Sequence, residues 1–293
     1  MNNKLASNVE ENEQLSPPTS ESDFMSDSPN LSQEKTGGGR CSKDTNIPLI
    51  SNISEEFSSL NCNDFRVSCN VKEKIIIVLD RCKDEEHTPF QDNHGNIHNF
   101  LSVLKNAIEM FVHLKSSIDE KHQFALVLLD ENEATWCLDF TNNVKEIVKS
   151  LNTVHEGNAE DVFNLNSLFD EISKRVNIPD VLEGFAIPPP FTVRVILFYN
   201  RSFTYPDIEI TESVKELLQN SCFNVDVLVS HEPLDSVNNC EKIFKILQNI
   251  DKKGYSYFFS VGRDISTLMR SMGKLLGHPL QRPVQNIASY SFS

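Results

Sequence analysis

The 293-residue sequence has no apolar run near the roughly 20 residues that a membrane-spanning helix requires. Its first residues, MNNKLASNVEENEQL, also lack the apolar stretch of a secretory signal, so we expect no signal peptide. Positive charge is scarce, because 27 Lys and Arg stand against 42 Asp and Glu and give a net charge of −15. Since nucleic-acid binding needs a basic face, we expect neither direct nucleic-acid binding nor membrane insertion.

The sequence also lacks paired cysteines. Seven cysteines are dispersed without any C-x-x-C motif: Cys41, Cys62, Cys69, Cys82, Cys137, Cys222 and Cys240. An odd, scattered set is typical of reduced thiols in the cytosol or nucleus, and it argues against a disulfide framework.

Motifs of common enzymes are missing as well. There is no G-x-x-x-x-G-K-[ST] or G-x-G-x-x-G phosphate cradle and no G-x-S-x-G elbow, and no Ser, His and Asp spacing indicates a triad. The sequence therefore favours a binding function over catalysis.

Residues 1–65 differ in composition from the rest. They are rich in Ser, Asn, Glu and Asp and show no apolar periodicity, which predicts a disordered acidic tail. Ser16 and Ser28 precede proline, and Ser32 precedes glutamine, so these three serines are candidate phosphorylation sites.

The body of the chain, residues 66–276, alternates apolar strands with amphipathic helices. Strand patterns occupy residues 73–80, 123–130, 135–140, 191–200, 223–230 and 253–261. Helical spacing occupies residues 99–118, 141–151, 164–176, 211–220, 237–250 and 264–276, with Thr141 as the expected cap of the second helix and Leu114 among the apolar positions of the first. The short link between the second and third strands predicts a hairpin. We therefore predict one α/β domain with a mostly parallel sheet, one antiparallel edge strand and helices on both faces.

The first strand ends in Asp80-Arg81-Cys82-Lys83-Asp84, and this stretch resembles the start of a von Willebrand factor A domain. Working members have D-x-S-x-S here, whose oxygens hold a divalent metal together with a Thr and an Asp from later loops. In this chain Cys82 replaces the first serine, and a thiol is a poor magnesium ligand.

The later loops diverge from that pattern as well. Val162 stands near the expected Thr, and Asn200 and Arg201 stand where the Asp is expected. We expect no functional metal at this degenerate site, and we expect Asp80 to cap a turn or to pair with Arg81 or Lys83. The alternative is a metal-dependent ligand-binding domain that uses Asp80.

A histidine-rich loop offers a second alternative. His87, His94 and His98 lie near Asp92, and a helical His-x₃-His pair could hold zinc. Pro89, together with Gly95 and Asn96 between the last two histidines, favours a solvated loop instead. An unrecognised α/β enzyme that uses this loop remains the third hypothesis.

Several stretches together closely resemble the BRISC and BRCA-A complex member family. They are EKIIIVLD, AIEMFVHLKSSIDEKHQFALVLLDENEATW, FNLNSLF, IPPPFTVRVILFYNRS and LLGHPLQRPVQNIASYS. The resemblance runs from about Val67 to Phe292 and leaves out the acidic tail.

The resemblance implies a non-enzymatic, von Willebrand A-like scaffold subunit without a cofactor. It implies a place in deubiquitinase assemblies that cleave polyubiquitin linked through lysine sixty-three. Catalysis there belongs to a JAMM metalloprotease with an Abraxas-type pseudo-enzyme partner. The nuclear assembly serves DNA-damage recruitment and the cytoplasmic one immune and mitotic signalling, so both locations are expected.

The resemblance also implies that the domain and a C-terminal P-x-x-R element bind a UEV-containing subunit known as BRE. In residues 277–293 that element matches Pro279-Leu280-Gln281-Arg282. Prolines would hold the segment extended, and Arg282 would offer a planar donor to a carboxylate or carbonyl. The predicted partner-binding residues are Pro279, Leu280, Arg282, Pro283, Val284, Ile287, Tyr290 and Phe292. The alternative is that this segment folds back over the body.

Overall fold

The computed structural model describes residues 71–179 and 188–288. The predicted tail with Ser16, Ser28 and Ser32 lies outside the described residues, as do Tyr290 and Phe292. Within the described residues no helix is both long and apolar enough to cross a membrane.

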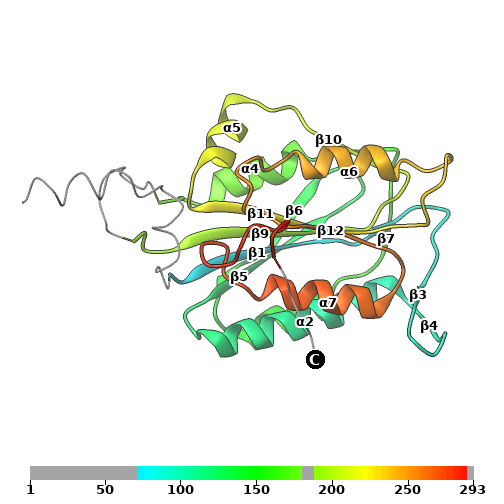
Figure 1. Ribbon diagram of the computed structural model, residues 1–293, viewed down its shortest axis with the longest axis horizontal. Coiled ribbons are helices and arrows are strands. Elements are labelled where there is room, and N and C mark those ends of the chain that lie inside the picture. The colour runs from blue at the N-terminus through cyan, green and yellow to red at the C-terminus, as the bar shows by residue number, and fades with distance from the viewer. Residues whose placement is uncertain (1–70, 180–187, 289–293) are drawn as a thin grey trace, which may run out of the picture. The chain divides into compact units, whose positions relative to one another are not determined.

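A single six-stranded sheet runs through the domain in the order β12-β11-β9-β1-β5-β6 (Figure 1). Its strands are β1 (Glu73–Asp80), β5 (Gln123–Leu129), β6 (Ala134–Thr141), β9 (Thr192–Tyr199), β11 (Phe223–Ser230) and β12 (Phe258–Val261). All neighbours are parallel except β5 and β6, which form the antiparallel hairpin at one edge. When the six strands are numbered in chain order and read across the sheet from β6, their order is 3-2-1-4-5-6, which is the doubly wound arrangement. The predicted fold class is confirmed.

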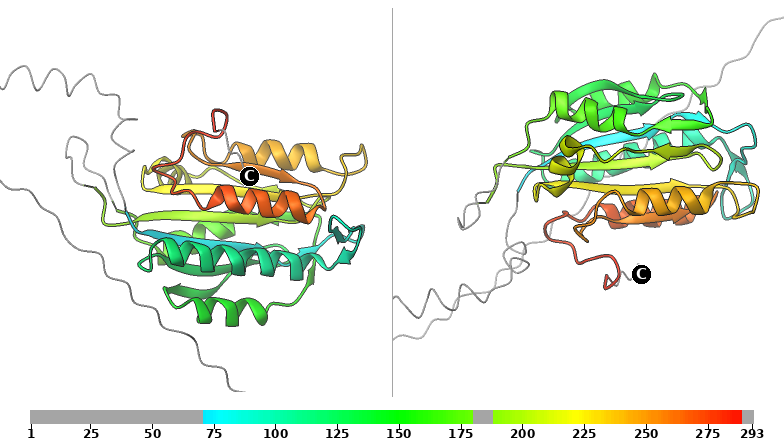
Figure 2. Two further views of the ribbon diagram at one scale, coloured as in Figure 1. Left: turned by 60° about the horizontal axis from the view of Figure 1, so that its bottom comes forward. Right: turned by 90° about the horizontal axis from the view of Figure 1, so that it is seen from above.

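Helices cover both faces of the sheet (Figures 1 and 2). One face packs against α2 (Phe100–Ile118), α3 (Val144–Asn152) and α7 (Ile265–Leu275). The other packs against α4 (Asn166–Arg175), α5 (Glu212–Gln219) and α6 (Cys240–Gln248). Along β1, Ile75 and Ile77 enter the first core and Ile76 and Val78 enter the second, because successive side chains of a strand point to opposite faces.

Short strand pairs lie beyond the carboxyl ends of the main strands. They are β2 (Cys82–Lys83) with β7 (Gly157–Asn158), β8 (Val162–Asn164) with β10 (Tyr205–Asp207), and β3 (Phe90–Gln91) with β4 (Ile97–His98). These pairs were not predicted, because two or three residues carry no measurable periodicity.

Three local predictions were wrong. Thr141 ends β6, and α3 is capped instead by Asn143, whose side chain accepts a hydrogen bond from Lys145 N. Leu114 is 44% exposed, so it lies outside the core. The last strand begins only at Phe258, because Gly254 takes a positive φ of 81° and the Tyr257 amide bonds to a side chain.

Candidate functional site

The carboxyl edge of the parallel strands is where open α/β sheets bind ligands, at the point where the strand order reverses. Here that point lies between β1 and β9, and it is occupied by an ion pair. Arg201, two residues after β9, donates from Nε and Nη2 to the carboxylate of Asp80 at 3.0–3.2 Å. Both side chains are fully buried.

Arg201 also binds the neighbouring connection. Its Nη1 donates to the carbonyl of Glu131 at 2.6 Å, and its Nη2 donates to the carbonyl of Asp130. Burial raises the pKa of Asp80, although the charge of Arg201 opposes this. Burial alone would lower the pKa of Arg201, but the charge and the hydrogen bonds of Asp80, together with smaller contributions from other neighbours, raise the pKa. A fixed cation therefore joins the loops after β1, β5 and β9.

The residues at this edge do not fit the divalent metal of a von Willebrand A domain. The guanidinium of Arg201 covers both oxygens of Asp80, which a metal would need. Burial raises the pKa of Cys82 to about 12, so its sulfur stays a neutral thiol. Val162 lies in β8 and offers no oxygen from its side chain.

The expected partners of Asp80 were partly wrong. Asp80 does accept a turn hydrogen bond from Cys82 N at 3.2 Å. However, Arg81 pairs with Asp130 at 2.5 Å and Lys83 pairs with Glu156 at 2.8 Å.

Asp84, the last residue of the stretch that resembles the metal motif, faces the β9–β10 connection. Its carboxylate accepts from the amides of Ser202 and Phe203 at 2.6 and 3.3 Å and from the Thr204 hydroxyl at 3.2 Å. A side chain of the protein thus fills a set of donors that could otherwise hold an external anion.

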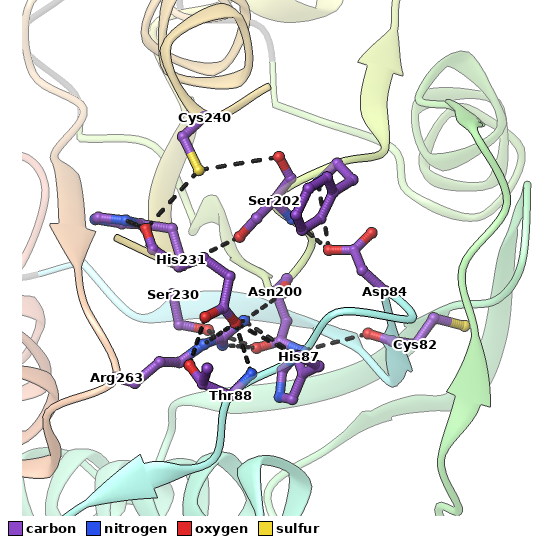
Figure 3. Close-up of polar contacts among 12 residues, drawn as sticks. Cys82, Asp84, His87, Thr88, Asn200, Ser202, Ser230, His231, Cys240 and Arg263 are labelled. Atoms are coloured by element: carbon purple, nitrogen blue, oxygen red, sulfur yellow. Dashed lines mark hydrogen bonds and ion pairs between the residues drawn. The ribbon is translucent and has the colours of Figure 1, made fainter. Parts of the chain in front are cut away.

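A second polar cluster closes the edge on the side of β11 and β12 (Figure 3). Arg263 donates to Glu232, to Asn200 and to Nδ1 of His87. The pKa of His87 is lowered to about 4, mainly by burial and to a smaller extent by the charge of Arg263. His87 is therefore neutral near pH 7, with its proton on Nε2. Thr88 completes the cluster by donating to Glu232 from its amide at 2.9 Å.

The other predicted histidines do not form a metal site. Asp92 accepts from the amides of His94 and Asn96, and it contacts His98 Nε2 at 3.2 Å. Across the described ranges, no group of three or more His, Cys, Asp or Glu side chains is placed to hold a metal. His87 faces Arg263, so the loop divides its histidines between different contacts.

A third polar cluster lies in the body of the sheet, on the face covered by α2 and α7. Arg194 of β9 lies between Glu73 of β1 and Asp226 of β11, at 3.2 and 2.7 Å, and all three side chains are fully buried. Lys115 of α2 pairs with Glu73 as well. Burial alone would raise the pKa of Glu73, but Arg194 and Lys115 hold it below its usual value.

Arg282 joins this cluster from the C-terminal segment. It donates through two nitrogens to the carboxylate of Asp226, with Nη1 at 2.9 Å, and to the carbonyl of Tyr255 at 2.9 Å. Its guanidinium lies 3.9 Å from the ring centre of Tyr257. The Tyr257 hydroxyl in turn donates to the carbonyl of Pro283 at 2.6 Å.

The rest of the described C-terminal segment is also held in place. His278 Nε2 donates to the carbonyl of Val71 at 2.8 Å, and the side-chain amide of Gln285 pairs with both backbone groups of Phe258. Pro279 and Leu280 are buried. Among the predicted partner-binding residues, Pro283 and Ile287 are exposed and Val284 is half-buried. As far as residue 288, the segment takes the folded-back arrangement, and Arg282 is not free.

The sequence contained an unused signal for the third cluster. Glu73, Arg194 and Asp226 are charged residues inside strands that are otherwise apolar, and charges at such positions are rarely buried unless paired. The identity of their partners could not be predicted from spacing.

Two open hollows lie on the described surface. One of about 500 Å³ lies along α3, where Val144, Val148 and Lys149 line it together with His113 of α2. The other, of about 220 Å³, lies beside His87, Asn99 and Phe100 at the start of α2. The described thiols Cys82, Cys137 and Cys240 are free, and of these three only Cys137 is exposed.

Comparison with curated proteins gives matches to proteins named BRISC and BRCA1-A complex member 1. The one from Xenopus laevis is 38% identical over 229 residues, which are 77% of this chain and 69% of that protein. The one from Homo sapiens is 35% identical over 231 residues, with the same two shares. The one from Danio rerio is 35% identical over 232 residues, which cover 61% of its length.

No family model matches the chain. Among solved structures, the VWA domain of SpRpn10 aligns with a TM-score of 0.44 at 14% identity, covering 73% of this chain and all of that one. The vWF domain of the pilus tip protein Mfa5 from Porphyromonas gingivalis aligns with a TM-score of 0.44 at 9% identity, covering 71% and 95%. Likeness at this level adds nothing to what the strand order itself establishes.

Proposed function

The chain belongs to the family of BRISC and BRCA1-A complex member 1, and from that premise we propose that it is a non-catalytic scaffold subunit of a deubiquitinase assembly. Its work is to hold other subunits together, and the cleavage of polyubiquitin linked through lysine sixty-three belongs to a JAMM metalloprotease partner. We place it with that enzyme, an Abraxas-type pseudo-enzyme and a BRE-like subunit, in the nucleus and the cytoplasm.

The observation that carries the proposal is the closed carboxyl edge of the sheet. The place where this fold binds metals or substrates is occupied by the buried pair of Asp80 and Arg201. Beside it, the carboxylate of Asp84 fills the amide donors of the next loop. Metal-assisted hydrolysis needs protein ligands and an open coordination position, and neither feature is available at this edge. These features favour a role in binding other subunits through the surface of the domain.

We further propose that the exposed part of the C-terminal segment contacts the BRE-like subunit. Ile287 is 71% exposed and follows Pro283 and Val284, so these side chains are available to a partner. Pro279, Leu280 and Arg282 have the different role of fixing the segment to the domain. The division into a tail of residues 1–65, a domain of residues 66–276 and a partner-binding segment of residues 277–293 remains part of this proposal.

The test is co-purification of the tagged full-length chain from cells, followed by an assay of the eluate. We expect a metallo-deubiquitinase and a BRE-like subunit to co-purify, and we expect the eluate to cleave polyubiquitin linked through lysine sixty-three. A chelator should abolish that cleavage, and the chain purified alone should have none. Chelator-sensitive cleavage by the pure chain, or an eluate without a deubiquitinase, contradicts the scaffold role.

A matched pair of variants tests the C-terminal contact. Ile287→Asp should reduce recovery of the BRE-like subunit, because it puts a charge into an apolar contact. Asn286→Asp changes the neighbouring exposed side chain and serves as the control. Equal recovery with both variants means that this segment does not contact the subunit.

A further inference from the structure

Four exposed apolar side chains gather at the carboxyl edge of the sheet. Val162 of β8 and Tyr205 of β10 are register partners in a parallel pair, and they are 37% and 39% exposed. Leu234 and Val237 lie in the loop between β11 and α6, and they are 59% and 70% exposed. We refer to Val162, Tyr205, Leu234 and Val237 as the loop patch.

Hydrogen bonds bring the two halves of the loop patch together. The loop of Leu234 and Val237 begins after Glu232 and ends before Asn239. The amide of Glu232 donates to the hydroxyl of Ser202 at 2.9 Å, and the amide of Asn239 donates to the carbonyl of Ser202 at 2.8 Å. Both ends of the loop are therefore bonded to Ser202, which lies three residues before Tyr205 in the chain. The loop projects at the end of the domain where the parallel strands finish (Figure 1).

The register of β8 with β10 gives the patch its orientation. Phe163 and Pro206 are paired and buried, so their neighbours Val162 and Tyr205 point to the other face of the small sheet, toward solvent. Exposed apolar side chains that lie close together lower solubility, and such groups often mark interaction sites.

The rim of the loop patch is negatively charged. Exposed acidic residues lie on the connections that carry the patch, and on the β5–β6 link, whose Asn132 carbonyl accepts from Asn164 N at 2.9 Å: Glu131, Glu160, Asp161, Asp207 and Asp235. Residues 130–133, 156–164, 200–209 and 231–239 contain one Lys or Arg in total, which is Arg201. The guanidinium of Arg201 is fully buried against Asp80 and cannot offset the rim.

Two cations of the connection after β1 are already engaged. Arg81 is paired with Asp130 at 2.5 Å, and Lys83 is paired with Glu156 at 2.8 Å. The connections that form the rim therefore carry an excess of negative charge around an apolar centre. Opposite charge on a partner would steer its approach and fix its register, while apolar contact at the centre would supply most of the affinity.

We propose that the loop patch docks a partner protein, and that the docked segment has apolar anchors flanked by lysine or arginine. The inference goes beyond the proposed function, because it concerns a surface remote from the C-terminal segment and needs no metal. An aromatic ring and three aliphatic side chains on short loops suit a short segment lying across them. The partner's basic residues would face Asp161 and Asp235.

The probe is a pair of short synthetic peptides with the same leucine and phenylalanine anchors. One carries lysine between the anchors, and its twin carries glutamate at the same positions. Binding to the full chain is measured by fluorescence anisotropy at low and high salt. The lysine peptide should bind at least about tenfold more tightly than its twin, and the difference should shrink at high salt.

Variants locate the site on the full chain. Leu234→Ser with Val237→Ser should weaken the lysine peptide by about tenfold, which corresponds to about 1.4 kcal/mol. Met110→Ser with Leu114→Ser removes two exposed apolar side chains from α2 and is the matched control, with no expected loss. Thermal unfolding of each variant shows whether the fold is retained.

Hydrogen exchange supplies an independent readout. The bound lysine peptide should slow exchange in residues 202–206 and 231–238. Four outcomes overturn the proposal. Three concern the peptides: equal affinity for both, no binding of the lysine peptide, or a loss with the α2 control that equals the loss with the loop variant. The fourth is a dimer in sedimentation that dissociates when Leu234 and Val237 are replaced, because the patch would then be a contact between copies of this chain.

Discussion

Replacing Arg282 with alanine should destabilise the domain even when no partner is present. Arg282 gives Asp226 two charged hydrogen bonds, donates to the carbonyl of Tyr255 and lies over the ring of Tyr257. Its side chain is 2% exposed and that of Asp226 is fully buried. The change would therefore leave a buried carboxylate with fewer partners.

The size of the effect follows from what Asp226 keeps. Removing one member of a buried ion pair costs about 3–5 kcal/mol when the other charge is left alone. Asp226 retains Arg194 at 2.7 Å and the amide of Tyr257 at 2.7 Å, so the lower end of that range applies. We expect a loss of about 3 kcal/mol in the free energy of unfolding, which corresponds to about 6–12 °C in Tm for a domain of this size.

The assay is thermal and urea unfolding of the purified chain, without any partner. Asn286→Ala in the same segment is the control and should leave Tm unchanged, because Asn286 is exposed. A chain that ends at Gly277 should lose at least as much stability as the Arg282 variant. If Arg282→Ala unfolds like the wild type and only fails to bind a partner, then Arg282 is a free anchor and the described contacts do not operate in solution.

Three further outcomes are expected. Arg201→Ala should lower the free energy of unfolding by about 3–5 kcal/mol, whereas the exposed control Arg270→Ala should not. Added Mg²⁺ should leave the Tm of the wild type unchanged, and a rise in Tm with Mg²⁺ contradicts the pairing of Asp80 with Arg201. The pKa of His87 is lowered to about 4, so the folded state resists its protonation. The free energy of unfolding should therefore fall by about 1–2 kcal/mol between about pH 6.5 and pH 5. Urea unfolding at both pH values measures this fall, and His87→Gln should reduce it. A chain without residues 1–60 should unfold at the same temperature as the full chain, because the described core is built from later residues, and a clearly lower Tm refutes this.

Apolar pattern predicted the sheet because its central strands β1, β9 and β11 are buried on both faces. Stretches such as residues 75–79 are continuously apolar, and sequences of this kind have few other stable placements. Boundaries were harder where a polar residue had two possible roles. Thr141 can cap a helix or end a strand, and the nearby Asn143 took the cap because its side chain reaches Lys145 N.

The pairing of charges could not be predicted to the same degree. Arg194 lies 121 residues from Glu73, and Arg282 lies 56 residues from Asp226. Spacing along the chain says nothing about contacts at that range. The expected pairing of Asp80 with a close neighbour was wrong for a simple reason: successive side chains leaving a strand point to opposite sides, so Arg81 turns to Asp130.

An arginine at the metal position changes what the carboxyl edge can do. A bound metal keeps a coordination position open and can accept a carboxylate from a partner. The guanidinium of Arg201 donates to Asp80 and to the carbonyls of Asp130 and Glu131, all within the protein. It therefore holds the loops together as a metal would, but it leaves no open coordination position for a ligand. Under the proposals above, recognition by this chain comes from side chains that remain exposed, which are the loop patch on the connections beyond the strands and the outer residues of the C-terminal segment.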